Sequence, residues 1–185
     1  AWLESRLGIA KGGRLQRVLS RAPLAMVMAV DTMESRLQCL AELGVPADLL
    51  GPLVVRTPRL LHWPTSTIKG RVQWLRDARI LPDGDGSGDA RAAFLRRQPD
   101  YFSSGSKDCA DTLRWLVGLG LSEEEAGALL FAEPATLSQP LEQLELHASF
   151  FLSVIGASLQ DLREVPHVLT CDLAKVPLLR HAYCL

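Results

Sequence analysis

The chain has 185 residues, 48% of them hydrophobic, which is enough to bury a core, and its formal net charge is −1. A charge so close to zero argues against a uniformly basic nucleic-acid binder, and no apolar run approaches the roughly 20 residues that a membrane-spanning helix needs. The charge is unevenly distributed, however. Residues 1–114 carry 17 Lys and Arg against 12 Asp and Glu, and residues 115–185 carry 3 against 9.

A pattern centred on proline recurs along the chain. Hydrophobic residues stand four places before and three places after each of five prolines. After the first four prolines they also stand 10, 14 and 17 places on, which is the i, i+4, i+7 spacing of one face of an α-helix. Each unit is therefore predicted to be a helix, a proline-marked turn and a longer helix. The prolines are Pro23, Pro58, Pro99, Pro134 and, in weaker form, Pro166.

The hydrophobic positions of this pattern form the predicted core. Such a helix pair cannot bury its apolar stripe alone, so neighbouring units must stack, and the sequence predicts an all-α helical repeat solenoid. We expect one domain over residues 1–185, with units 1–44, 45–80, 81–120, 121–156 and 157–185. The core positions are Leu19, Val54, Leu95, Leu130 and Leu162 before the prolines; Met26, Leu61, Phe102, Leu137 and Leu169 after them; and Met33, Leu37, Leu40, Ile68, Val72, Leu75, Cys109, Leu113, Leu116, Leu144, Ala148 and Phe151 on the longer helices.

Helix ends and starts are also marked between the units. A glycine follows the longer helix at three junctions, where it supplies the left-handed turn that commonly ends a helix. At two of these junctions a serine comes next, with an acidic residue three places later, which is the spacing of an N-terminal capping box. The glycines are Gly44, Gly120 and Gly156, and the capping pairs are Ser122 with Glu125 and Ser158 with Asp161.

No catalytic or metal-binding pattern stands out. The four cysteines form no CxxC pair, and the four histidines have no carboxylate or cysteine at ligand spacing. The loop around Asp83 and Asp85 begins like a calcium-binding loop, but Phe94 stands where such a loop ends in a glutamate. The sequence has no Ser/His/Asp signature and no Gly-rich phosphate loop. We therefore expect no enzyme, no metal and no cofactor.

These features together resemble the mitochondrial transcription termination factor (mTERF) family, whose repeat has a proline after its first helix and leucine-like residues along its second. The stretches that carry the resemblance best are 43–75, 119–156 and 162–181. The last is similar to the family's final repeat, where a proline followed by an arginine is typical. Here two leucines separate Pro177 from Arg180.

The resemblance implies a left-handed superhelix of helix–helix–3₁₀ units whose positively charged groove wraps double-stranded nucleic acid. It also implies an organellar location, and we expect the mitochondrion rather than the chloroplast. The chain begins at Ala1 inside a predicted helix. We expect it to be a piece of a longer precursor whose transit peptide is missing.

Cationic residues recur at two positions of the repeat, two places before the proline and 13 places after it. Each row supplies about one cation per unit, and such a row can follow a phosphate backbone. The alternative is that the rows are solvated outer faces, since every amphipathic helix needs a polar side. The first row is Arg21, Arg56 and Arg97, and the second is Arg36, Arg71 and His147, interrupted by Thr112. The predicted nucleic-acid-binding residues are Arg21, Arg36, Arg56, Arg59, Lys69, Arg71, Arg97, Arg114 and Arg180.

Two aromatic residues are candidates for stacking on bases. Trp63 and Tyr101 stand in turns between helices, where a ring can face unpaired bases. Trp74 and Trp115 instead sit beside the core stripe of the longer helices, so we expect them to pack between units.

We predict a non-enzymatic, sequence-specific double-stranded DNA-binding protein that acts in organellar transcription termination or regulation, as a monomer that does not enter a membrane. Arginines would wrap the duplex electrostatically, and a few would read guanines in the major groove. Two alternatives stay open. One is an RNA-binding or ribosome-assembly factor on the same scaffold, and the other is a solenoid that docks a protein partner on its acidic C-terminal units.

Overall fold

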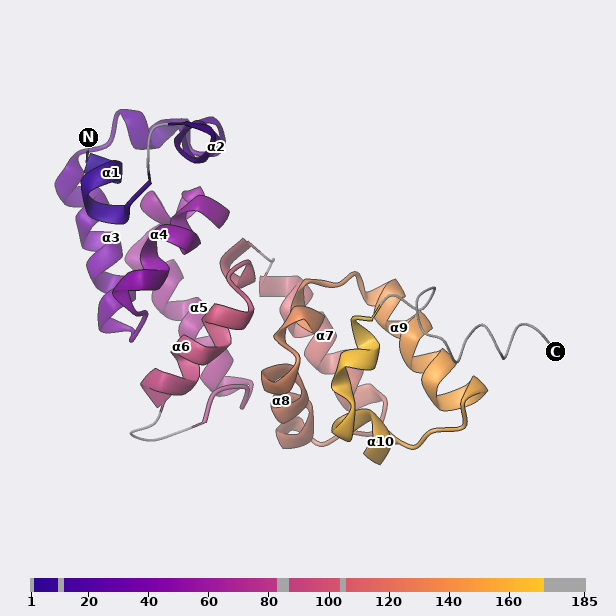
Figure 1. Cartoon of the computed structure of the whole chain (residues 1–185). Helices are drawn as coiled ribbons and strands as arrows, with labels where there is room; N and C mark the ends of the chain where they lie inside the picture. Colours follow the sequence, from indigo (N-terminus) through magenta and orange to yellow (C-terminus); the bar gives the residue numbers. More distant parts are fainter. Residues whose placement is uncertain (1, 10–11, 83–86, 104–105, 172–185) are drawn as a thin grey trace. The chain divides into compact units, whose positions relative to one another are not determined.

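The computed structural model describes residues 2–9, 12–82, 87–103 and 106–171, and in these ranges the chain is helical and contains no strand (Figure 1). The prediction of an all-α helical repeat is confirmed. The chain divides into two compact units, Ala1–Ser106 and Lys107–Leu185. The first carries 15 Lys and Arg against 10 Asp and Glu, and we call it the basic unit; the second carries 5 against 11, and we call it the acidic unit. A single domain over residues 1–185 stays a prediction.

Each repeat consists of a helix, a short 3₁₀ turn and a second helix. Helix α4 (Ala47–Arg56), turn η2 (Pro58–Leu61) and helix α5 (Thr65–Asp77) show the arrangement most clearly. Proline cannot donate a backbone hydrogen bond, so Pro58 ends the helical ladder. The chain then tightens into a 3₁₀ turn, in which the Leu60 N–H donates to the Thr57 carbonyl over 3.1 Å. The position of the proline thus predicts where each helix breaks.

The same order of elements recurs on both sides of this repeat. In the third repeat the 3₁₀ turn begins two residues after Pro99 rather than at the proline. The remaining elements of the basic unit are α1 (Trp2–Leu7), α2 (Gly13–Arg21), η1 (Pro23–Met26), α3 (Val30–Glu42), α6 (Ser87–Arg97) and η3 (Tyr101–Ser103). Those that follow are α7 (Ser106–Gly118), α8 (Glu123–Ala132), η4 (Pro134–Ser138), α9 (Leu141–Ser149), the π-helical turn η5 (Phe150–Val154), α10 (Leu159–Glu164) and η6 (Pro166–Leu169).

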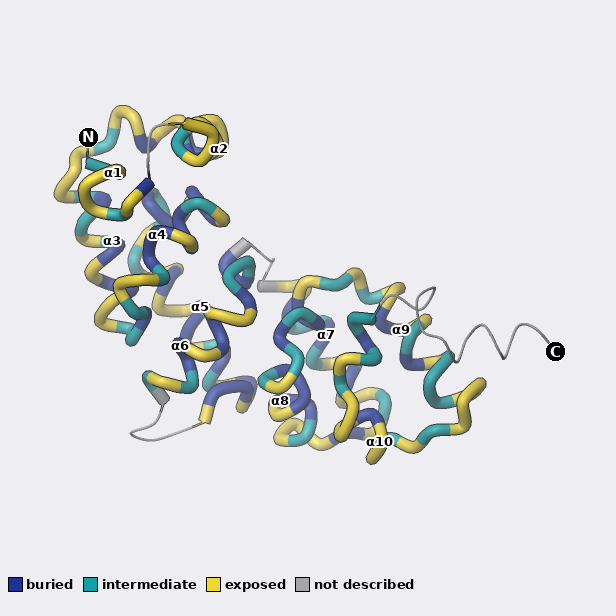
Figure 2. The backbone as a smooth tube through the Cα atoms, in the orientation of Figure 1, coloured by how far each residue is buried: buried dark blue, intermediate teal, exposed yellow. Residues whose placement is uncertain are grey.

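The predicted core is largely confirmed. Of the 22 hydrophobic positions in the repeat pattern, 18 are buried, and three (Leu19, Leu113 and Phe151) are half-buried (Figure 2). Met26 is the exception, because it is 69% exposed. Turn η2 packs on α3 and η6 on α9, the longer helix of the preceding repeat, as well as on the first helix of their own repeats, and η1 packs on α2 of its own repeat. The prediction that Met26 is a core residue is therefore wrong.

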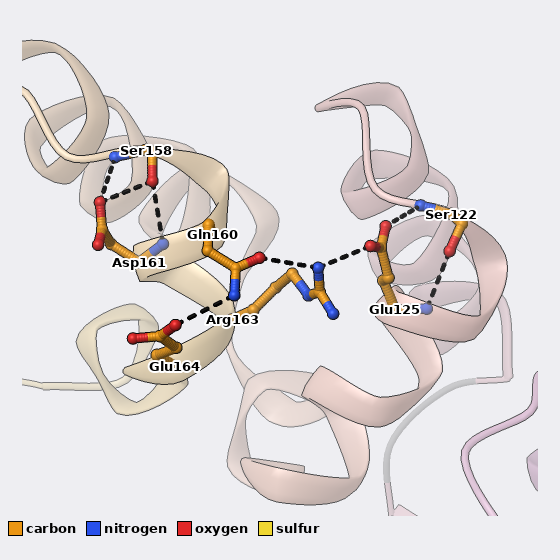
Figure 3. A network of polar contacts seen from close by, with 7 residues as sticks. All are labelled: Ser122, Glu125, Ser158, Gln160, Asp161, Arg163 and Glu164. Carbon is orange, nitrogen blue, oxygen red and sulfur yellow. Dashed lines mark hydrogen bonds and ion pairs between the residues drawn. The ribbon is translucent and has the colours of Figure 1, made fainter.

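The predicted capping boxes form at the start of α8 and of α10 (Figure 3). Ser122 Oγ accepts a hydrogen bond from the Glu125 N–H over 3.2 Å, and Glu125 Oε2 accepts one from the Ser122 N–H over 2.8 Å. Ser158 and Asp161 repeat this exchange over 3.2 and 2.7 Å. The reciprocal bonds satisfy backbone donors that the first turn of a helix leaves without partners, so both helices begin at the predicted residue.

An ion pair ties the two capped helices of the acidic unit together. Glu125 Oε1 lies 2.7 Å from Arg163 Nη1 on α10 (Figure 3). The hydrogen bond from the Ser122 N–H, and to a lesser degree the charge of Arg163, lowers the pKa of the Glu125 carboxyl. A lowered pKa in the folded state stabilises the fold above the ordinary carboxyl pKa, and this contribution is lost as the pH falls through the lowered value. The junction between α8 and α10 should therefore weaken in acid.

Candidate nucleic-acid interface

A concave surface of the basic unit gathers three of the predicted arginines. Arg21 ends α2, Arg56 ends α4 and Arg59 lies in η2, and all three border one hollow of about 450 Å³. We call this hollow the arginine groove. None of the described residues that line it is acidic, and three of them are arginines. The described lining is Ser20, Arg21, Arg56, Thr57, Pro58, Arg59, Trp63 and Phe102.

The repeat explains why these arginines converge. Arg21 and Arg56 each occupy the last residue of a first helix, where a cation interacts favourably with the negative end of the helix dipole. Helix α2 packs against both α4 and η2, and this packing brings the two helix ends to the same groove. The local preference alone would place each arginine at a helix end, but the stacking of repeats turns them into one surface.

A second hollow adjoins the arginine groove. It has a volume of about 240 Å³, and Arg56 lines both hollows. Arg14 on α2 adds a fourth guanidinium group to this surface. Sequence reasoning missed Arg14, which belongs to neither cationic row. The second hollow is lined by Leu7, Gly8, Ile9, Arg14, Gly51, Pro52, Val55 and Arg56.

The arginines of the groove differ in how they are neutralised. Arg56 Nη1 lies 3.2 Å from Asp100 Oδ2, in an ion pair whose side chains are 57% and 43% exposed. Arg21 and Arg59 are both exposed, and in the described part of the chain neither has an ion-pair or hydrogen-bond partner. An exposed ion pair contributes little to stability and exchanges readily. Arg56 can therefore turn to an external anion, and Arg21 and Arg59 are available to one.

The second cationic row, 13 places after the proline, makes contacts between repeats. Arg36 Nε donates to the Trp63 carbonyl, in the next repeat, over 3.2 Å, and Arg36 Nη1 donates to the Thr32 carbonyl over 2.7 Å. At the equivalent position of the fourth repeat, His147 Nδ1 lies 2.8 Å from the Leu169 carbonyl, again in the next repeat. Side chains of this row thus fasten a longer helix to the turn that follows it in the stack.

Arg71 in the second repeat follows the same rule. Its Nη1 donates to the Tyr101 carbonyl over 3.4 Å, and its guanidinium group lies 4.8 Å from the centre of the Trp63 ring. The Tyr101 hydroxyl in turn donates to the Arg71 carbonyl over 2.7 Å. The residues predicted 13 places after the proline are therefore structural contacts in this fold, and their role toward phosphates stays a prediction.

The two aromatic stacking candidates have different surroundings. Trp63 is half-buried and lines the arginine groove, with Arg71 over its ring. Tyr101 is only 2% exposed, and its ring packs edge-on against Phe94 and Phe102 at centroid distances of 5.6 and 5.4 Å. Tyr101 is therefore a core residue here rather than a ring available to a base, and a stacking role for Trp63 stays a prediction.

The mTERF family model matches residues 5–182, which is nearly the whole chain and includes every repeat described above. The chain belongs to the mTERF family. The mTERF fold is a helical repeat solenoid, so the predicted fold class is confirmed, and membership suggests nucleic-acid binding and a part in transcription regulation. No curated protein sequence matches this mTERF chain.

The other predicted contact residues of the mTERF chain lie outside the arginine groove. Arg97 is exposed at the end of α6, and Lys69 is exposed on α5. Arg114 lies on α7 in the acidic unit and forms an ion pair with Asp111. Arg180 falls outside the described residues. Contacts of these four with nucleic acid stay predictions.

Within residues 2–9, 12–82, 87–103 and 106–171, no three His, Cys, Asp or Glu side chains are grouped so that they could hold a metal ion. Among the helices of these same ranges, none combines the length and apolar character that crossing a membrane requires.

The contacts of Arg36 give a prediction for the stability of the mTERF repeats. Arg36→Met keeps an apolar stem of similar length but removes both hydrogen bonds, so the free energy of unfolding should fall by about 1.5–3 kcal/mol. Urea denaturation followed by circular dichroism measures this change. Arg17→Met, at an exposed position of α2, is the matched control and should stay within about 0.5 kcal/mol of the wild type. If Arg36→Met unfolds like the wild type but loses affinity for DNA, Arg36 is a phosphate contact instead.

Proposed function

We propose that this chain binds double-stranded DNA sequence-specifically and acts in the termination or regulation of transcription in an organelle, the mitochondrion rather than the chloroplast. The observation that carries the proposal is the arginine groove with its adjoining hollow. These two hollows, which share Arg56, gather four guanidinium groups, of Arg14, Arg21, Arg56 and Arg59, and none of the described residues in either lining is acidic. Membership of the mTERF family also supports nucleic-acid binding and a part in transcription regulation.

The chemistry of these arginines suits a nucleic-acid backbone. A guanidinium group presents several N–H donors in a planar fork that matches two phosphate oxygens, and it stays charged at any physiological pH. Contacts of this kind position a protein on a duplex, whereas base-edge contacts in the major groove supply sequence specificity. A protein held in this way needs no catalytic group, because its presence on the template is enough to obstruct a polymerase.

The salt dependence of binding tests the proposal. Neutralising about four phosphates should give a slope near −3.6 in a plot of log affinity against log salt concentration, at about 0.9 per phosphate on a duplex. Fluorescence anisotropy with a labelled DNA duplex, titrated between roughly 50 and 200 mM salt, measures this slope. A protein-docking solenoid would show little affinity for the duplex at any salt concentration, and that result would reject the proposal.

RNA and protein partners are the alternative outcomes. Selection of bound fragments from random duplex DNA and random RNA pools, run side by side, separates DNA binding from RNA binding. Enrichment of one duplex motif would support a sequence-specific DNA-binding protein, whereas enrichment of RNA alone would favour RNA processing or ribosome assembly. A protein partner of the acidic unit stays a prediction, and so does a monomeric state.

A further inference from the structure

The stacking of repeats brings two positions of the pattern together. Arg56 stands two places before Pro58, and Asp100 stands one place after Pro99, in the next repeat. Their side chains form the 3.2 Å ion pair described above. Leu61 and Phe102, three places after these same prolines, are both fully buried, so the register of the two repeats agrees. At this junction the residue two places before one repeat's proline thus contacts the residue one place after the next repeat's proline.

The equivalent pair one repeat earlier consists of two arginines. Arg21 stands two places before Pro23, and Arg59 stands one place after Pro58. Both side chains line the arginine groove, as the register requires. Where the second junction of the stack pairs a cation with a carboxylate, the first junction therefore places two cations in one hollow.

This junction is chemically incomplete without an anion. Two like charges in one hollow repel each other unless a negative group lies between them. Among the described residues the lining contains no carboxylate, and neither arginine has a hydrogen-bond or ion-pair partner in the protein. At the next junction Asp100, which stands at the position equivalent to Arg59, supplies the carboxylate that pairs with Arg56.

We propose that Arg21 and Arg59 form a two-arginine site for one phosphate group of a nucleic-acid backbone, which supplies the negative charge that Asp100 supplies at the following junction. The site deepens the proposed function and rests on it. Two guanidinium forks can hold a tetrahedral phosphate through several charge-assisted hydrogen bonds, because each fork matches two phosphate oxygens. The volume of about 450 Å³ leaves room for the sugars on either side of the phosphate, next to the half-buried Trp63.

Exchanging the charges of the two junctions tests the site. Arg59→Asp recreates at the first junction the ion pair seen at the second, so affinity for a fluorescein-labelled random duplex should fall about 10- to 100-fold while the fold is kept. Asp100→Arg copies the two-arginine arrangement to the second junction, so affinity should rise and the salt slope should steepen by about 0.9. Melting followed by circular dichroism confirms that both variants are folded.

The matched control is Arg17→Asp, which makes the same change of charge on an exposed residue of α2 that does not line the groove. If Arg17→Asp weakens duplex binding as much as Arg59→Asp, only the net charge of the basic unit matters. The two-arginine site is then overturned, while the proposed function stands. A salt slope that Asp100→Arg leaves unchanged would overturn the site in the same way.

A second arm separates a backbone phosphate from a free one. Inorganic pyrophosphate is titrated into the wild type and into Arg59→Asp, and the arginine side-chain signals are followed by NMR. Loss of both duplex and pyrophosphate binding in Arg59→Asp supports a phosphate site that nucleic acid uses. If the wild type binds pyrophosphate but no duplex, the proposed function fails and the site belongs to a free phosphate compound. If the wild type binds neither, the site is overturned together with the proposed function.

Discussion

Leu61→Ala is expected to lower the free energy of unfolding of the basic unit by about 2–5 kcal/mol, because the leucine is fully buried in η2 and its loss leaves a cavity. Turn η2 packs against α3 of the preceding repeat, so the cavity opens at a junction of the stack rather than at its surface. Urea denaturation of the chain, followed by circular dichroism, measures the change.

The first repeat supplies the matched control for this prediction. Met26 occupies the same position relative to its proline but is 69% exposed, so Met26→Ala should change the free energy of unfolding by no more than about 0.5 kcal/mol. The two residues have the same place in the sequence pattern and differ in what packs against them. Equal losses in the two variants would show that position in the repeat, and not burial, sets the cost.

The contrast between Met26 and Leu61 shows how far a sequence pattern reaches. Hydrophobic spacing around the prolines predicts the helices, the turns and most of the core, because helix period and proline chemistry act locally. Burial of a turn also depends on what the preceding repeat places over it. Met26 has the right residue type and spacing, but the pattern itself does not show which helices pack on its turn.

The cationic rows show the same limit for the candidate site. Recurrence at one repeat position shows that residues share a face, but it does not show whether that face meets solvent or the next repeat. Arg36 reaches a backbone carbonyl of the following repeat, whereas Arg21 lines a groove. A bond to a backbone carbonyl leaves no trace in the spacing of side chains. Arg14 lies outside both rows, so only the packed structure brings it to the groove.

Reversing the charges of the arginine groove is expected to reduce affinity for duplex DNA by about 10³-fold or more. The variant Arg21→Glu, Arg56→Glu, Arg59→Glu removes three charge-assisted contacts, each of which contributes about 1.5–3 kcal/mol, and adds carboxylates that repel phosphates. Arg71 is left unchanged, because its hydrogen bond to the Tyr101 carbonyl and its contact with Trp63 would confound a loss of binding with a loss of structure.

The control for this reversal carries the same change in net charge elsewhere on the basic unit. Arg17, Arg79 and Arg96 are exposed and do not line the groove, and the exposed ion pair of Arg96 with Asp48 matches that of Arg56 with Asp100, so reversing all three to Glu should weaken binding far less, and mainly at low salt. Fluorescence anisotropy gives the two affinities, and circular dichroism shows whether both variants keep the helical content of the wild type. Affinity lost equally in the two variants would mean that the duplex responds to the overall charge of the unit. Affinity lost in neither would mean that it binds somewhere other than the basic unit's groove.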